Sequence, residues 1–492
     1  MGSCIISFTH YFCIRCGWAW AIVHLVCTFA MRDAGAVETA HAVEHVPPNV
    51  ILIMVDDLGY NDLSCFGHPK IQTPVLDQLA SDGIRLTSFY SGASVCTPSR
   101  MALLTGCHPV RMGWKQGVIG YKMGLRDGLH PLAVTLAEIF QNFGYVTAMS
   151  GKWHLGSATP CRPHRQGFDT AYYIDKSNNQ TQQIWRNDSV VEEKFVNRNL
   201  TEQFTDEALR FIKKNRRQKF FLYLPYTAPH FPVQAHPEWK GRSKFGVYGD
   251  VVEEVDARIG QILTSLTDEG IAQDTIVLFC SDNGPQPGQA ARAFPFRGMK
   301  WSALEGGTRV PCIVRWSGQI PAGKSSDQVV TAMDVMPTLC DLAGIDLRER
   351  TSLLRQNATT EQSSTSYPVD GRSVAMLLRG KVESLPERAI LYWHGMGQLQ
   401  AIRKGKWKLF LDRRATVAGL GIDGPLPDAQ TEALKALAKG DGPVLFNLAK
   451  HHDELIDYSL ERPDIVKQLS DAAMRELAET KKLTIPLWQS HK

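Results

Sequence analysis

The sequence predicts an α/β fold, in which helices sandwich a large, mostly parallel sheet and a smaller α+β domain follows at the C-terminal end. Short runs of β-branched and aromatic residues alternate with amphipathic helical segments, as parallel strands with helical crossovers require. Beyond residue 385 the rhythm changes to closely spaced short strands. A chain of 492 residues is too long for one ordinary hydrophobic core and long enough for a large and a smaller domain. Its 43% hydrophobic content indicates a folded globular protein.

The strands of the main sheet are predicted from short apolar runs, at residues 49–55, 145–149, 219–224 and 275–280. Residues 132–143 and 250–266 place apolar side chains at helical spacing between these strands, and Gly144 can end the first helix. Alternating strands and helices predict a mostly parallel sheet with both faces covered.

The C-terminal part of the chain predicts a different architecture. Residues 351–369 are polar and lack a pattern, so we expect a surface loop there. Short antiparallel strands are expected at 389–394, 398–403, 406–411 and 444–448, with a closing helix at 463–480 and an insertion carrying its own short helix at 414–441. We therefore expect a large domain at 48–385 and a smaller one at 386–492.

The N-terminal residues 1–36 predict a signal peptide. The apolar run 18–30 follows Arg15 and is too short to span a bilayer, and a small-residue site follows at 34–36. An uncleaved membrane anchor is the alternative. Export predicts a secreted or periplasmic protein, lysosomal or secretory in a eukaryote, with no stable membrane insertion after leader removal.

Charge and cysteine content exclude some classes of function. The net charge is +4, from 54 basic and 50 acidic residues, and this balance does not support nucleic-acid binding. Four of the 11 cysteines lie in the leader, and the other seven match no zinc pattern. Three of four Asn-x-Ser/Thr sites fall within 179–201 and indicate an exposed segment.

Polar residues follow each of the four predicted strands at once. The segments are Asp56-Asp57, Ser150 to His154, Thr227 to His230, and Ser281 to Gly284. Because the carboxyl ends of parallel strands meet at one sheet edge, we expect these groups to converge. Asp56, Asp57, Asp282 and Asn283 offer oxygen ligands only, which suits Ca²⁺ or Mg²⁺. Each pair alone could instead be a turn or a helix cap.

Cys96 is expected just before a helix N-terminus. Pro98 fits the first turn, apolar residues follow at helical spacing, and Gly106 fits the end. Free N–H groups and the helix dipole favour an anion there, and Arg100 could bind two of its oxygens. Taken alone, Cys96 could be a buried small hydrophobe and Arg100 a surface cation.

Cys96-Thr97-Pro98-Ser99-Arg100 resembles the Cys-x-Pro-x-Arg signature of the type I sulfatases, and the arylsulfatase A-like group in particular. Further blocks resemble that family in order, at 56–59, 151–156, 227–230, 281–285 and 300–309. The resemblance implies an alkaline-phosphatase-like fold and one calcium ion, with Cys96 joining the four oxygen ligands. It also implies that a formylglycine-generating or anaerobic sulfatase-maturing enzyme converts Cys96 to 3-oxoalanine (formylglycine) before folding.

The resemblance assigns a role to each remaining site residue. A hydrated formylglycine would use one hydroxyl to attack sulfur and the other to expel sulfate, with His154 assisting the second hydroxyl. His230 or Lys300 would protonate the leaving oxygen. Arg100, Lys152 and Lys300 would hold the negative charge of the ester.

The sequence therefore predicts a sulfatase that hydrolyses sulfate monoesters of a sulfated carbohydrate, and aryl sulfates as well. The alternative is a phosphatase or phosphonate monoester hydrolase of the same superfamily, although those enzymes often use two zinc ions and more histidines. A non-catalytic binder of sulfated glycans is a third possibility. Loops 160–203, 231–247 and 286–299 are expected to select the substrate.

Overall fold

A ten-stranded mixed sheet lies at the centre of the computed structural model, which describes residues 47–124, 127–347, 368–417 and 428–489. In spatial order its strands are β10 (Ser189–Glu192), β9 (Ile184–Arg186), β8 (Thr170–Ile174), β7 (Val146–Lys152), β11 (Phe220–Pro225), β1 (Asn49–Val55), β12 (Thr275–Ser281), β14 (Cys312–Arg315), β2 (Ile84–Leu86) and β15 (Lys324–Ser326). The five strands from β8 to β12 run parallel, whereas β9, β10 and β14 add antiparallel pairings. The predicted α/β class is confirmed.

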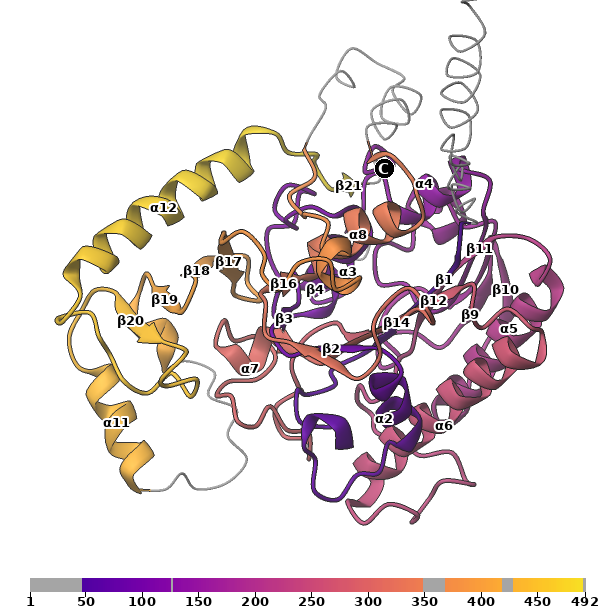
Figure 1. The fold of residues 1–492 in the computed structure, drawn as a ribbon, viewed down its shortest axis with the longest axis horizontal. Coiled ribbons are helices and arrows are strands. Elements are labelled where there is room, and N and C mark those ends of the chain that lie inside the picture. The colour runs from indigo at the N-terminus through magenta and orange to yellow at the C-terminus, as the bar shows by residue number, and fades with distance from the viewer. Residues whose placement is uncertain (1–46, 125–126, 348–367, 418–427, 490–492) are drawn as a thin grey trace, which may run out of the picture. The chain divides into compact units, whose positions relative to one another are not determined.

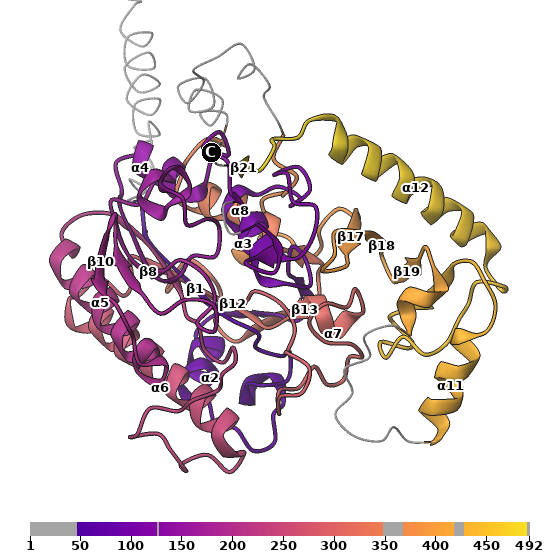
Figure 2. The ribbon, with the colours of Figure 1, turned by 180° about the vertical axis from the view of Figure 1, so that it is seen from behind.

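Helices cover both faces of this sheet because alternate residues of its strands are apolar on both sides. Val50, Leu52 and Met54 of β1 belong to one core cluster, and the residues between them belong to the other. Figure 1 shows one face covered by α2 (Pro74–Ser81), α5 (Leu200–Asn215) and α6 (Gly246–Asp268), and the opposite face by α3 (Cys96–Thr105), α4 (Leu136–Asn142) and α8 (Val335–Leu342). Figure 2 shows the same layers from behind.

A second, antiparallel sheet forms near the C-terminal end, from β17 (Ala389–Trp393), β18 (Leu399–Lys404), β19 (Trp407–Phe410) and β20 (Val444–Asn447). The long helix α12 (Pro463–Lys482) packs Leu469 and Ala473 on one of its faces. The helix α11 (Asp428–Ala438) packs Leu434 and Leu437 in the core cluster on the other. The four predicted strands, the closing helix and the helix of the insertion are therefore confirmed, while the domain boundary at residue 385 stays a prediction.

Three predicted elements differ from the structure in their bounds by more than two residues. The helix expected at 250–266 begins four residues earlier, at Gly246. The helix expected at 132–143 begins only at Leu136, because Thr135 forms a capping box with Glu138: Thr135 Oγ1 accepts from the Glu138 N–H at 3.2 Å, and the Glu138 carboxylate accepts from the Thr135 N–H at 2.7 Å. The strand expected at 145–149 continues to Lys152, so Ser150 and Gly151 lie within β7. The predicted signal peptide and nearly all of the predicted loop at 351–369 lie outside the described residues.

Short elements complete the described part of the chain. They are β3 (Phe89–Tyr90), β4 (Val118–Ile119), β5 (Lys122–Met123), β6 (Asp127–Gly128), β13 (Arg309–Val310), β16 (Val330–Thr331), β21 (Trp488–Gln489), α7 (Glu305–Thr308), α10 (Ala375–Leu378) and several single 3₁₀ turns. Among the described helices, none combines the length and apolarity needed to cross a bilayer.

Candidate active site

The predicted convergence of polar strand ends is confirmed. β7, β11, β1 and β12 are consecutive parallel neighbours, so their carboxyl ends meet at one edge. Asp56 and Asp57 follow β1, Lys152 ends β7, His230 follows β11 and Asp282 follows β12. All five are buried, although the first and the last of them are more than 200 residues apart in the sequence.

The helix α3 carries Cys96 into this cluster. Val95 is extended and precedes the helix, Cys96 is its first residue, and Gly106 ends it in the left-handed conformation with φ 66°. The Cys96 Sγ lies 3.3 Å from Asp56 Oδ1 and 3.9 Å from Asp57 Oδ1. The prediction of a helix starting here is confirmed, and the cysteine opens the helix rather than preceding it.

Each of the three carboxylates pairs with one buried cation. The pairs are Lys152 Nζ to Asp56 at 2.5 Å, Lys300 Nζ to Asp57 at 2.7 Å, and Arg100 Nη2 to Asp282 at 2.8 Å. Arg100 and Lys300 are therefore not surface cations, the alternative that their local sequence allowed. Three carboxylates and three cations balance, so a divalent cation would leave the site able to accept about two negative charges.

His230 is held by a residue that the sequence did not single out. Its Nδ1 lies 3.0 Å from Asn178 Oδ1 and 2.8 Å from the Phe231 carbonyl oxygen. A carbonyl can only accept, so Nδ1 carries a proton and Nε2 faces Asp57 at 3.6 Å. Asn178 belongs to a polar run that reads only as a surface loop, and no signal in the sequence marks it.

His154 approaches the cluster in a strained backbone conformation, with φ 59°, and Asp57 does the same with φ 66°. His154 Nε2 lies 3.0 Å from the carbonyl oxygen of Ile119, so it donates. Its Nδ1 is buried and meets no hydrogen-bond partner in the described part of the chain. Burial, reinforced by the charge of Lys152, holds the pKa of His154 well below its ordinary value. His154 is therefore neutral, with a free lone pair on Nδ1.

Burial also decides the protonation of Cys96 and of two carboxyl groups. It raises the pKa of the Cys96 thiol, and the neighbouring Asp56 raises it further, so the thiol stays protonated. Burial and repulsion from Asp56 raise the pKa of Asp282 to about 7. Burial alone would also raise the pKa of Asp56, but Lys152 and His230 hold it well below its usual range.

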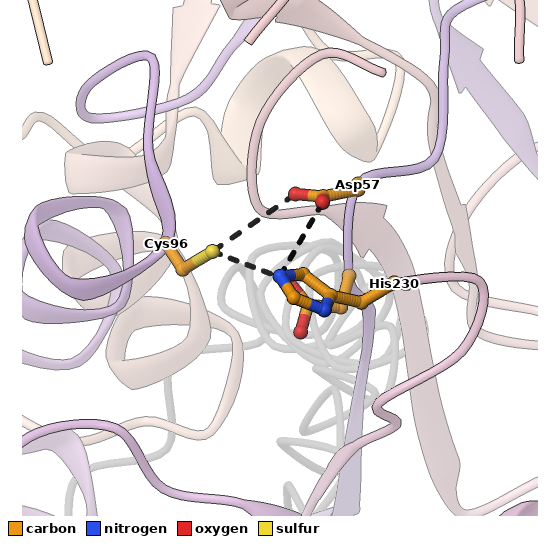
Figure 3. Close-up of side chains that lie close together, drawn as sticks. Asp57, Cys96 and His230 are labelled. Atoms are coloured by element: carbon orange, nitrogen blue, oxygen red, sulfur yellow. Dashed lines mark hydrogen bonds and ion pairs between the residues drawn. The ribbon is translucent and has the colours of Figure 1, made fainter. Parts of the chain in front are cut away.

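The cluster fits a metal ion. Ligand atoms of Asp56, Asp57, Cys96 and His230 all lie within 4.8 Å of one another, and all four residues are buried. Figure 3 shows the Cys96 sulfur and the His230 ring directed toward Asp57. The Asn283 Nδ2 donates to Asp57 Oδ1 at 2.7 Å, while its Oδ1 is buried, has no hydrogen-bond partner among the described residues, and remains available as a ligand.

The family model described as Sulfatase matches residues 48–345. The chain belongs to the sulfatase family. It is 33% identical over 443 residues to arylsulfatase A of Homo sapiens, a match that covers 83% of this chain and 82% of the relative. It is 33% identical over 424 residues to N-acetylgalactosamine-6-sulfatase of Canis lupus familiaris, covering 79% and 75%. The predicted type I, arylsulfatase A-like group is confirmed, and this sulfatase is a sulfuric ester hydrolase.

Solved structures confirm the alkaline-phosphatase-like fold of this sulfatase. The structure of Ps i-CgsB in complex with k-i-k-neocarrahexaose is 25% identical, has a TM-score of 0.70, and covers 89% of this chain and 95% of that chain. A phosphonate monoester hydrolase of Agrobacterium radiobacter covers 90% of this chain and 100% of its own at a TM-score of 0.59, with 17% identity. The second likeness shows the fold alone, so the phosphonate hydrolase alternative is only a distant relationship.

Proposed function

We propose that this sulfatase hydrolyses sulfate monoesters of a sulfated carbohydrate, and aryl sulfates as well, with residue 96 in the formylglycine form. The observation that carries the proposal is the state of Cys96: a fully buried thiol, kept protonated, beside Asp56 and Asp57 in the group that could hold a metal ion. A protonated thiol is a poor nucleophile and a poor ligand. The hydrate of formylglycine would supply a hydroxyl nucleophile in its place and a second hydroxyl for releasing sulfate.

The metal that we propose is a single Ca²⁺, held by Asp56, Asp57, Asp282, Asn283 and residue 96. Once the thiol is oxidised, these residues offer oxygen atoms only, which is the ligand set of a hard cation. Unmodified Cys96 with His230 and the two aspartates would instead suit zinc. When bound, calcium would polarise a sulfate oxygen and favour ionisation of a neighbouring hydroxyl.

The cations of the chain would hold the negative charge of the ester. Lys152, Lys300 and Arg100 are buried and already directed at the carboxylates, so they need little reorganisation when an anion enters. Burial alone would lower the pKa of Lys300, but Asp57 raises it above its usual value, so this lysine keeps its proton and stabilises charge.

Of the two proton donors predicted from the sequence, the geometry favours His230. Its Nδ1 proton is held by Asn178 and Phe231, which leaves Nε2 on the side of the cavity. Burial and Lys300 lower the pKa of His230 to about 4, and the negative charge of an entering sulfate ester would raise it. His230 would then pass a proton to the leaving oxygen, and the neutral His154 would accept one from residue 96.

We further propose export through residues 1–36 and conversion of Cys96 by a formylglycine-generating or anaerobic sulfatase-maturing enzyme. Cys96 is 1% exposed in the folded chain, which supports conversion before folding. The resulting protein would be secreted or periplasmic, or lysosomal in a eukaryote.

Mass spectrometry of the tryptic peptide 86–100, from cells with and without the maturation enzyme, tests this proposal. We expect the aldehyde in place of the thiol only when the enzyme is present, and aryl sulfate turnover in proportion to it. Metal analysis should find one calcium per chain, and aryl phosphate should be a far poorer substrate. Full activity of a protein whose Cys96 is entirely unmodified would contradict the proposed chemistry.

A further inference from the structure

A cavity of about 360 Å³ adjoins the candidate active site through Asn178, which lines the cavity and contacts His230. Two segments form it, 178–182 and 194–197, and both are held in place without a ligand. The Phe195 N–H donates to the Gln182 carbonyl at 2.9 Å, and Asn178 Nδ2 donates to Asn197 Oδ1 at 2.6 Å. The cavity is therefore formed before a ligand binds, as small-molecule sites usually are.

The chemistry of its lining suits a sugar. Side-chain amides dominate it, from Asn178, Asn179, Gln180, Gln182 and Asn197. An amide donates and accepts hydrogen bonds at once, which matches the hydroxyl groups of a carbohydrate. Phe195 adds a partly buried ring, and Lys194 adds an exposed positive charge. None of the described residues that line the cavity is acidic, so a sulfated or carboxylated sugar meets no repulsion there.

Asn178 belongs to this cavity and also contacts the candidate active site. It is only 7% exposed, it lines the amide-rich cavity, and its Oδ1 lies 3.0 Å from Nδ1 of His230. His230 in turn lies within the Asp57 and Cys96 group. The Asn178 side chain therefore separates a sugar in the amide-rich cavity from the residues around the sulfate.

The direction of the hydrogen bonds that run from Asn197 through Asn178 to His230 follows from the carbonyl of Pro232 at their start. The carbonyl of Pro232 can only accept, so Asn197 Nδ2 donates to it at 2.9 Å and Asn197 Oδ1 must face Asn178. Asn178 then donates through Nδ2 and presents Oδ1 to His230. The chain of amides thus presents a second acceptor to Nδ1 of His230, beside the Phe231 carbonyl, while Nε2 faces Asp57.

We propose that the cavity of residues 178–182 and 194–197 is a glycan subsite, which holds the sugar adjoining the sulfated one, and that Asn178 positions His230 from its wall. This inference rests on the proposed function and extends it to the substrate. It commits the sulfatase to an oligosaccharide, with the sulfated sugar at the cluster and a neighbouring sugar on the amides.

The test compares substrates with and without the second sugar. Lys194→Ala and Gln182→Ala change exposed lining residues, and Lys213→Ala on the exposed side of α5 is the matched control. The proteins come from a host that does not glycosylate, because Asn179-Gln180-Thr181 is an acceptor sequence within the lining. The substrates are p-nitrophenyl sulfate, then sulfated monosaccharides from chondroitin, heparan and carrageenan, and tetrasaccharides that end in the same sugars.

We expect wild type to prefer one tetrasaccharide series over its monosaccharide. Each lining variant should lower kcat/KM for that tetrasaccharide about tenfold, through KM, the equivalent of about 1.4 kcal/mol. For p-nitrophenyl sulfate both variants should stay within about twofold of wild type, as the control should for every substrate. Equal losses on all substrates, or no preference for any tetrasaccharide in an active wild type, would overturn the subsite. A matured wild type that hydrolyses no sulfate ester would overturn the proposed function instead.

Asn178 is tested by a pair of variants. Asn178→Ala removes the acceptor from His230 and should lower kcat about tenfold on every substrate, p-nitrophenyl sulfate included. Asn178→Asp keeps an oxygen beside Nδ1 and should recover most of that loss. Equal losses in the two variants, or a change confined to KM, would refute the positioning role.

Discussion

Two buried ionic clusters in the described part of the sulfatase consist of similar residues. We expect one to act in catalysis and the other in stability. The Asp57 cluster comprises Asp56, Asp57 and Asp282 with Lys152, Lys300 and Arg100. The Lys408 cluster joins β19 to the segment before β13 and comprises Glu305, Glu454 and Lys408. Every side chain in both is buried, so burial of charge alone does not separate a catalytic site from a structural one.

The surroundings of the two clusters differ in which hydrogen-bonding atoms lack a partner. Lys408 Nζ donates hydrogen bonds to the Ala303 carbonyl and to Glu305, each at 2.9 Å, and forms an ion pair with Glu454 at 2.8 Å. Tyr90 also donates to Glu305, at 2.6 Å. Beside the Asp57 cluster, by contrast, Asn283 Oδ1 and His154 Nδ1 have no hydrogen-bond partner among the described residues, whereas the one such oxygen of Glu454 is ion-paired with Lys408. Unpaired neutral acceptors, rather than charge, indicate where a ligand binds.

The largest expected effect comes from Asp282→Ala. Loss of this carboxylate removes a proposed ligand and leaves Arg100 with the longer, 3.7 Å ion pair to Asp56, so we expect calcium content to disappear and kcat/KM to fall by about 10⁴-fold. Asp464→Ala, an exposed change on α12, is the control and should be silent. Retained calcium and activity would show that Asp282 is not a ligand. They would also contradict the proposed difference in role between the two clusters.

The Lys408 cluster should respond in stability rather than in catalysis. Lys408→Met removes the cation that lies between two buried carboxylates, of which Glu305 keeps the more distant Arg309 at 3.4 Å, and we expect the free energy of unfolding to fall by about 3–5 kcal/mol. The kcat/KM of the remaining folded protein should stay within a few-fold of wild type. Denaturant unfolding measures the first quantity, with the exposed Lys467→Met as control. A specific loss of turnover at unchanged stability would break the comparison.

Lys300→Met makes the complementary change in the Asp57 cluster and should have the smallest effect of the three. Turnover should fall by about 10²–10³-fold, as when one donor to a developing anion is removed. The thermal midpoint should change little, because a bound cation can take over the charge of Asp57. A loss of stability as large as that of Lys408→Met would show that both clusters are structural.

The sequence predicted one of these clusters and missed the other, for a physical reason. Asp56, Asp57 and Asp282 follow apolar strands, and parallel strands bring their carboxyl ends together whatever the loops between them do. No such rule connects Lys408 on β19 with Glu454, which lies beyond β20. Each reads as an ordinary surface charge until the second sheet packs.

Local details failed for different reasons. The capping signal Thr135-x-x-Glu138 was present in the sequence but was outweighed by the apolar spacing from Leu132, so the helix was predicted four residues too early. Asn178 carried no signal at all, because its role depends on the path of a loop that only the folded chain shows.

β1 lies between β11 and β12, so the sheet around it is completed only after the ribosome has made β12. Ribosomes add about 5–20 residues per second, so roughly 10–40 s pass between synthesis of Cys96 and release of residue 281 at the end of β12. Until then β1 has only one of its two neighbours and the sheet edge around Cys96 is incomplete. The slow arrival of a distant strand thus leaves the cysteine uncovered for longer than a locally folded helix would, and the proposed oxidising enzyme would act within that interval.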